Sequence, residues 1–129
     1  MIGNKREYQI TRSARNRFGD RIALIDRDLD LGNPEVAAER ASLVTQVERL
    51  DHELAEFELL NSGQVSTFRE CGVEGLSALL VKARIARGLN QKELADLLDV
   101  DERQVQRWEA DEYERTAFWR LVDIADALA

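Results

Sequence analysis

The chain has 129 residues, of which 44% are hydrophobic, 33% charged and 6% aromatic. This is enough for one domain or two small ones, and no apolar run approaches the length of about 18 residues that a membrane span needs. The formal net charge of -7 argues against a protein that coats nucleic acid without sequence preference. One proline, seven glycines and few aromatic residues predict an all-α fold.

The sequence contains no pattern typical of catalysis, of a cofactor site or of a metal site. Cys71 is the single cysteine, which excludes internal disulfides and four-thiolate zinc sites, and His52 is the single histidine. No nucleophile is paired with a base by spacing, and no phosphate-binding loop is present. We therefore expect no enzyme, no catalytic residue, no cofactor and no metal. The basic N-terminus lacks the apolar run of a secretory signal, so we expect a reducing, cytoplasmic setting.

The first expected helix is capped by Thr11 or Ser13 and ends near Gly32. Its apolar positions recur with spacings of 4, 4, 3 and 4, which makes one stripe, at Ala14, Phe18, Ile22, Ile25 and Leu29. Asn33 and Pro34 then supply an N-cap and a first-turn proline for a second helix. The pattern predicts an antiparallel helical hairpin.

The second expected helix runs from Pro34 to about Leu60 and has a heptad rhythm from Leu43 onward. It would be roughly 40 Å long, against roughly 27 Å for its partner, so part of its apolar seam should need another cover. We expect a second copy of the chain to cover the end of the seam at Val47, Leu50, Leu54 and Phe57, with the C-terminal domain of the same chain or a different protein as alternatives. The small polar residues 61–64 then mark a domain boundary, with a hairpin domain at 1–63 and a second domain at 64–129.

Residues 91–109 carry the most informative pattern of the chain. Asn90 and Glu93 have capping-box spacing before a short helix, and Asp101 and Gln104 have it before another. Inward positions are expected at Leu94, Ala95, Leu98, Val100, Val105 and Trp108, with Trp119 in the same core. The small Ala95 allows two helices to cross closely after a short turn, which is the helix-turn-helix pattern. Tyr113 is expected either to pack below the second helix or to contact a phosphate.

These residues resemble the XRE/Cro-type helix-turn-helix family of phage repressors and bacterial regulators, a lambda-repressor-like bundle. The resemblance covers about residues 76–128, and Asp99 stands where the family usually has Gly at the turn. Asp tolerates left-handed backbone better than most residues. The layout of hairpin and module is also similar to the HigA-like antitoxin and prophage-associated subset. That similarity implies autoregulation of an operon and neutralisation of a toxin.

The family resemblance implies that the second helix of the motif lies in the major groove of operator DNA. Contacts with base edges would come from Glu102, Arg103, Gln104, Gln106 and Arg107, and the start of the first helix would bind a phosphate through Gln91 and Lys92. Lys82, Arg84 and Arg87 are further candidates for contacts with the DNA backbone.

The charge balance shapes the expected partners. Residues 76–108 hold six basic and five acidic side chains, so one copy should attract DNA weakly, and we expect a homodimer that spans two half-sites. The main prediction is an autoregulating, antitoxin-like repressor that binds double-stranded operator DNA. The alternatives are an antitoxin that chiefly neutralises a basic toxin protein, or an interaction module that does not bind DNA. The basic cluster at the start of the chain indicates a solvated helix face, a DNA backbone contact or an acidic partner.

Overall fold

The structure is a computed structural model that describes residues 1–28, 32–65, 68, 73–113 and 115–129. Within those residues every regular element is a helix, as the composition predicts. Contacts within the chain divide it into two compact units, residues 1–56 and residues 57–129. The boundary predicted between residues 63 and 64 lies a little further along, in the loop after the second helix. None of the helices in the described ranges is long and apolar enough to span a bilayer.

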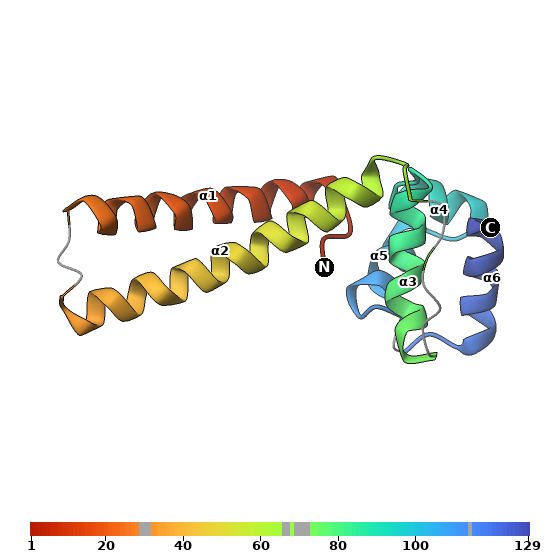
Figure 1. The fold of residues 1–129 in the computed structure, drawn as a ribbon. Coiled ribbons are helices and arrows are strands. Elements are labelled where there is room, and N and C mark those ends of the chain that lie inside the picture. The colour runs from red at the N-terminus through yellow and green to blue at the C-terminus, as the bar shows by residue number, and fades with distance from the viewer. Residues whose placement is uncertain (29–31, 66–67, 69–72, 114) are drawn as a thin grey trace. The chain divides into compact units, whose positions relative to one another are not determined.

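The first unit is built from α1 (Lys5–Asp28) and most of α2 (Pro34–Asn61), which run antiparallel (Figure 1). The predicted start of α1 at Thr11 or Ser13 is wrong. Asn4 caps the helix, because its Oδ1 accepts from the Glu7 amide at 2.9 Å while Glu7 Oε2 accepts from the Gly3 amide at 2.7 Å. Leu29 and the two residues before the predicted end at Gly32 lie outside the described residues.

The longer α1 changes the comparison between the two helices. It has 24 residues against 28 in α2, so the two helices differ much less in length than the sequence predicts. Arg15 bridges to Asp51 at 2.7 Å, which places α1 beside α2 at that level. The predicted start of α2 is confirmed, because Asn33 Oδ1 accepts from the Glu35 amide at 2.9 Å and Pro34 opens the helix.

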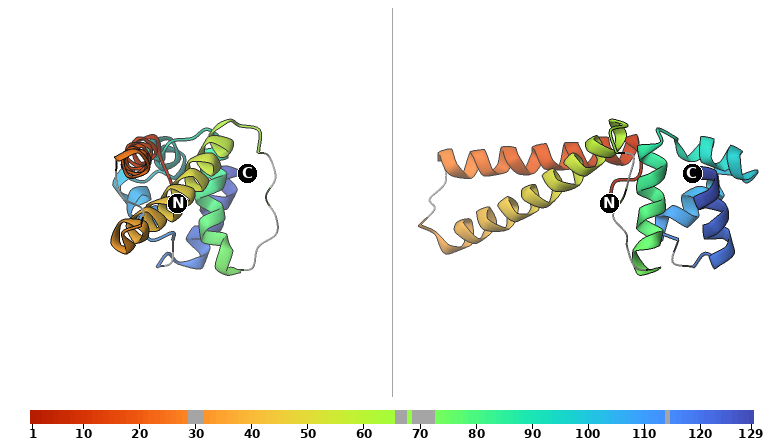
Figure 2. Two further views of the ribbon diagram at one scale, coloured as in Figure 1. Left: turned by 60° about the vertical axis from the view of Figure 1, so that its left-hand side comes forward. Right: turned by 45° about the vertical axis from the view of Figure 1, so that its right-hand side comes forward.

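The second unit is a helical bundle of α3 (Val73–Ala86), α4 (Gln91–Leu98), α5 (Glu102–Ala110) and α6 (Phe118–Leu128) (Figure 2). Helix α4 packs against both α5 and α6, and α3 packs against α6. The buried core includes Val81, Leu94, Val105, Tyr113 and Ile124. Because Leu94 and Ala95 are both buried, α4 presents its apolar face to the bundle, as the sequence pattern predicts.

Capping residues begin α4 and α5, and a left-handed residue ends α4, at the positions that the sequence predicts. Asn90 and Glu93 form a complete capping box at the start of α4, and Asp99 closes the helix with left-handed backbone at φ 54°. Asp101 caps α5 by accepting from the Arg103 amide at 3.0 Å. The second half of the capping box predicted there is wrong, because the Gln104 side chain accepts from Arg107 instead.

Candidate nucleic-acid interface

Helix α5 lies with one face in the core and the opposite face in solvent. Val105 is fully buried and Trp108 is half-buried, so together they fix the inner side of the helix. The exposed side chains are those of Glu102, Arg103, Gln106 and Arg107, and Gln104 is half-buried beside them. Five of the predicted DNA-binding residues therefore lie together on or beside one outward surface.

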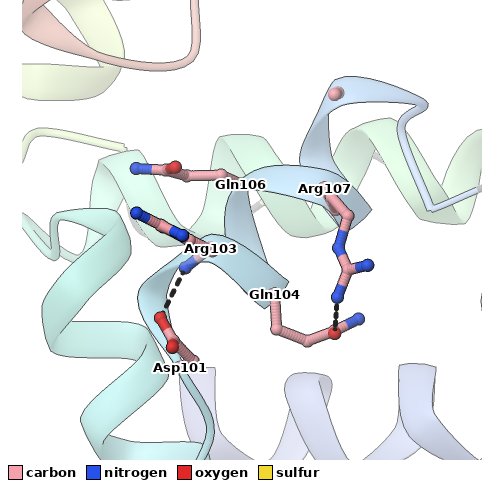
Figure 3. Close-up of a pocket in the computed structure, with 6 residues that line it drawn as sticks. Asp101, Arg103, Gln104, Gln106 and Arg107 are labelled. Atoms are coloured by element: carbon pink, nitrogen blue, oxygen red, sulfur yellow. Dashed lines mark hydrogen bonds between the residues drawn. The ribbon is translucent and has the colours of Figure 1, made fainter.

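An open hollow of about 660 Å³ runs along this surface (Figure 3). In the view of Figure 3, Arg103 and Gln106 extend the same way, whereas Gln104 and Arg107 extend away from them. The residues that line the hollow are Asp101, Arg103, Gln104, Gln106, Arg107 and Ala110. Such a face of long polar side chains on a rigid helix can offer several hydrogen-bond donors to flat base edges or to phosphates.

Two hydrogen bonds order side chains within this face. Arg107 Nη2 donates to Gln104 Oε1, and Gln106 Nε2 donates to Glu102 Oε1 at 3.3 Å. The Arg103 guanidinium has no side-chain partner among the described residues. Of the two arginines of α5, Arg103 is therefore the one that has no side-chain hydrogen bond or ion pair with a described residue to break when it meets a ligand.

A buried ionic network lies beneath this surface, which the sequence analysis missed. Glu109 accepts from Arg84 Nε at 2.6 Å, from Arg84 Nη2 at 2.9 Å and from Gln91 Nε2 at 2.8 Å. The side chains of Arg84 and Glu109 are only 3% and 5% exposed. Arg84 Nη1 also donates to the Leu89 carbonyl at 2.7 Å, so the network joins α3, α4 and α5.

Two predicted contacts need correction because of this network. The suggestion that Arg84 binds the DNA backbone is wrong, since a buried guanidinium cannot reach a phosphate. The Gln91 side chain is half-buried and bonded to Glu109, so the phosphate contact expected of that side chain is not available in this arrangement. Lys92 is exposed, with a loose ion pair to Asp96 at 3.7 Å. The signal for Arg84 was its position four residues after the buried Leu80, on the apolar face of α3.

Tyr113 completes the network from the loop after α5. Its side chain is almost fully buried and its hydroxyl donates to Glu109 Oε1 at 3.4 Å, so the packing alternative for Tyr113 is confirmed. Burial raises the pKa of the phenol, and the charge of Glu109 raises it further. The hydroxyl thus stays protonated and remains a hydrogen-bond donor.

Helix α6 buries Ile124 and Leu128 but exposes three of its other apolar side chains. Phe118 is 67% and Trp119 is 62% exposed, and Val122 is also exposed, so the prediction that Trp119 belongs to the core is wrong. Arg120 lies over the rings of Trp108 and Trp119, at 5.4 and 4.8 Å from their centres, and covers part of both.

The predicted dimer or partner interface on α2 is mostly covered within a single chain. Leu50, Leu54 and Phe57 are buried, and Val47 is half-buried. Cys71 lies outside the described residues. Within the described ranges, no group of three His, Cys, Asp or Glu side chains is arranged to hold a metal ion.

Comparison with known proteins bears on the second unit. Residues 80–128 match the model of the family described as Helix-turn-helix, of the XRE type. The chain therefore carries a helix-turn-helix domain in its C-terminal part. This family is a DNA-binding regulatory one, and the match supports a DNA-binding transcription regulator. No curated protein and no solved structure matches the chain.

The family match covers α4, the turn at residues 99–101 and α5, so the surface of α5 described above belongs to the second helix of the motif. In proteins of this architecture the second helix is the one that enters the major groove. The hairpin of α1 and α2 lies outside the matched residues.

Proposed function

We propose that the protein is a transcriptional regulator that reads an operator sequence through the outer face of α5. The observation that carries this proposal is the exposed row of Arg103, Gln106 and Arg107 on a helix whose opposite side is anchored by the buried Val105. A guanidinium can bond the O6 and N7 atoms of guanine at once, and a Gln amide can do the same with the N6 and N7 atoms of adenine.

The two arginines have different roles in this proposal. Arg107 is held by Gln104, so its guanidinium is oriented before DNA arrives. Arg103 has no internal partner among the described residues and can turn toward a base without breaking a bond. Glu102 holds Gln106 in a similar way, and it can accept from a cytosine amine when that bond opens. Lys92, at the start of α4, would contact a phosphate.

A gel mobility-shift titration tests the proposal, with the DNA upstream of the gene and a mixed-sequence duplex as probes. Wild-type protein should prefer the upstream DNA, and Arg103→Ala should weaken that binding by about 1–3 kcal/mol while relaxing base preference. Lys92→Ala is the matched control, because loss of a phosphate contact should weaken both probes equally. Equal binding of both probes by the wild type would reject sequence-specific reading.

We further propose that the protein binds DNA as a dimer on two half-sites. Residues 76–108 have six basic and five acidic side chains, so a single module gains little electrostatic attraction to DNA. Two surfaces can be compared as dimer interfaces by how far their apolar side chains are exposed. The stripe of Val47, Leu50, Leu54 and Phe57 has little surface left to offer, whereas Phe118, Trp119 and Val122 of α6 present exposed apolar side chains. The α6 surface is therefore the stronger candidate.

The second candidate function is that of an antitoxin that neutralises a basic toxin protein and regulates its own operon. Residues 62–129 hold nine basic and thirteen acidic side chains, and this acidic excess together with the exposed apolar side chains of α6 favours a basic protein partner. Co-expression with the product of the adjacent gene tests this function. A stable complex that relieves growth arrest supports it, and independent migration of the two proteins rejects it.

A further inference from the structure

The outer face of α1 carries four exposed cations, Lys5, Arg6, Arg12 and Arg17, which we call the basic strip. At 3.6 residues per turn, Lys5 and Arg12 fall in one row of the helix surface and Arg6 and Arg17 in a second. The strip is about 18 Å long at 1.5 Å per residue. This concentration of positive charge occurs in a chain whose net charge is -7.

The fold does not use the basic strip for its own ion pairs. Other arginines of the same helix pair with α2, with Arg15 at 2.7 Å from Asp51 and Arg21 at 2.7 Å from Glu39. None of the four strip residues has an ion pair with any residue that the structure describes. Glu7, the acidic residue of the first turn, points its carboxylate back to the Gly3 amide. The strip therefore presents unneutralised charge to solvent.

The position of two strip residues also works against helix stability. Lys5 and Arg6 are the first two residues of α1, where the helix dipole is positive and cations are unfavourable. Charges placed where they weaken the helix, and without partners in the fold, are better explained by a ligand of opposite charge than by helix formation.

The surface between the two rows is polar and, from Lys5 to Arg17, uncharged, and the exposed Asp20 continues it beyond Arg17. Helical spacing places Gln9, Ser13 and Asn16 there, and all three side chains are exposed. Amide and hydroxyl groups of this kind, combined with arginine, are the usual donors to phosphate oxygens in protein–DNA complexes. An Arg guanidinium also binds a phosphate with two parallel hydrogen bonds.

We propose that the basic strip binds the phosphate backbone of duplex DNA and adds affinity to the contact made by α5. This inference rests on the proposed function. Duplex DNA carries one charge per about 1.7 Å of its axis, so a strip about 18 Å long meets several phosphates. DNA is favoured over an acidic protein because the helix-turn-helix part of the chain supplies little positive charge of its own, with six basic against five acidic residues in 76–108.

The test compares the salt dependence of DNA binding by the full chain, measured by fluorescence anisotropy on a duplex that the wild-type protein enriches from a random-sequence pool. The strip variant is Arg12→Gln with Arg17→Gln. The matched control is Arg27→Gln with Arg49→Gln, two exposed residues outside the strip that change the net charge equally. Far-UV circular dichroism verifies that each variant keeps its helices.

The strip variant should bind at least about tenfold more weakly near 0.1 M salt, and its slope of log affinity against log salt should fall by about 0.9 for each lost phosphate contact. The control should keep the wild-type slope. Arg12→Lys with Arg17→Lys should also keep it, because the charge remains. This pattern supports the inference.

Three other results would overturn the inference. The first is a strip variant that keeps the wild-type slope. The second is an equal loss of affinity in the strip and control variants, through net charge alone. The third is a Lys variant that loses as much DNA affinity as the Gln variant. If the strip binds an acidic protein and not DNA, the strip variant keeps both its DNA affinity and the wild-type slope, which is the first of these results. Failure of the wild-type protein to enrich any duplex would instead reject the proposed function, so the two failures are distinguishable.

Discussion

Glu109 connects three helices of the C-terminal unit through its carboxylate. It accepts from both Arg84 and Gln91, and the Tyr113 hydroxyl approaches at 3.4 Å. Since the Arg84 and Glu109 side chains are almost fully buried, each depends on the other to offset the loss of hydration. The same network holds Gln91, at the start of α4, next to the end of α5.

We predict that Glu109→Ala destabilises the second unit by about 3–5 kcal/mol, because it leaves the Arg84 guanidinium buried without a counter-charge. Urea unfolding followed by tryptophan fluorescence measures the change. The double variant Arg84→Met with Glu109→Leu removes both charges and should unfold at a higher urea concentration than Glu109→Ala. A single variant as stable as the wild type would show that the pair is not buried in solution.

At the scale of elements, three successive helices end with the same backbone conformation. Gly88, Asp99 and Glu112 each adopt left-handed backbone after α3, α4 and α5, at φ 71°, 54° and 51°. The residue after each donates its amide to a carbonyl five residues back, at 3.2, 3.0 and 2.7 Å. This is the Schellman motif, in which glycine is the most favourable residue at the left-handed position. Asp99 and Glu112 therefore carry strain that Gly88 does not.

We predict that Asp99→Gly and Glu112→Gly each raise the stability of the second unit, by up to about 1 kcal/mol, because glycine relieves the left-handed strain at two exposed sites. Gly88→Ala is the control, because it makes the reverse change and places a Cβ on a left-handed residue. Nothing lies within 4 Å of a Cβ added there, so its expected loss of about 1 kcal/mol would come from backbone conformation alone. Thermal unfolding of the three variants measures these shifts. A fall in melting temperature for both glycine variants would contradict the prediction.

The hairpin is held partly by ion pairs between α1 and α2. Arg15 meets Asp51, Arg21 meets Glu39 and Arg40 meets Asp26, at 2.6–2.7 Å. Each arginine hydrogen-bonds its carboxylate and thereby lowers the pKa of Asp26, Glu39 and Asp51. A carboxyl group whose pKa is lowered by folding stabilises the fold above its ordinary pKa, and this contribution is lost as the pH falls through the lowered value.

We predict that the hairpin loses stability between about pH 5 and pH 2, as these three carboxylates become protonated. The effect should be modest, because the paired side chains are between 37% and 48% exposed. Melting temperatures from circular dichroism across this range provide the measurement. The variant with Asp26→Asn, Glu39→Gln and Asp51→Asn should show a shallower pH dependence than the wild type. Identical curves for both proteins would mean that the ion pairs contribute nothing.

At the scale of the whole molecule, we propose that the exposed apolar side chains of α6 form the contact with a second copy of the chain. Phe118 and Val122 are four residues apart on α6 and therefore share a face of the helix. We predict that the wild-type protein sediments as a dimer and that Phe118→Glu with Val122→Glu produces monomers, because four added charges would meet across a two-fold axis. Sedimentation velocity measures the mass of each.

The control for this prediction is Val47→Glu, which places a charge on the α2 stripe at a half-buried position. It should leave the dimer intact if α6 forms the interface. The reverse result, with monomers from Val47→Glu alone, would assign the interface to α2. A wild-type protein that is monomeric at about 10 μM would reject both interfaces, because the dissociation constant of any dimer would then lie well above that concentration.

The helix-turn-helix motif and most helix ends could be predicted from the sequence, because these depend on side chains within one or two turns of each other. Asn33, Asn90 and Asp101 cap the helices that follow them, and Asp99 adopts the expected left-handed backbone. The start of α1 was missed because Asn4 and Thr11 are both capping residues, and nothing local decides between them.

The contacts of the long polar and aromatic side chains could not be predicted in this way. Arg84 pairs with a residue 25 positions away, and periodicity cannot tell a buried arginine with a partner from one that binds DNA. Trp119 is of a residue type common in cores, yet its side chain is 62% exposed and lies against the Arg120 guanidinium, whereas Tyr113 and Ile124 are buried. Caps and turns are fixed by neighbours in the chain, whereas burial and pairing depend on which distant residues meet when the helices pack.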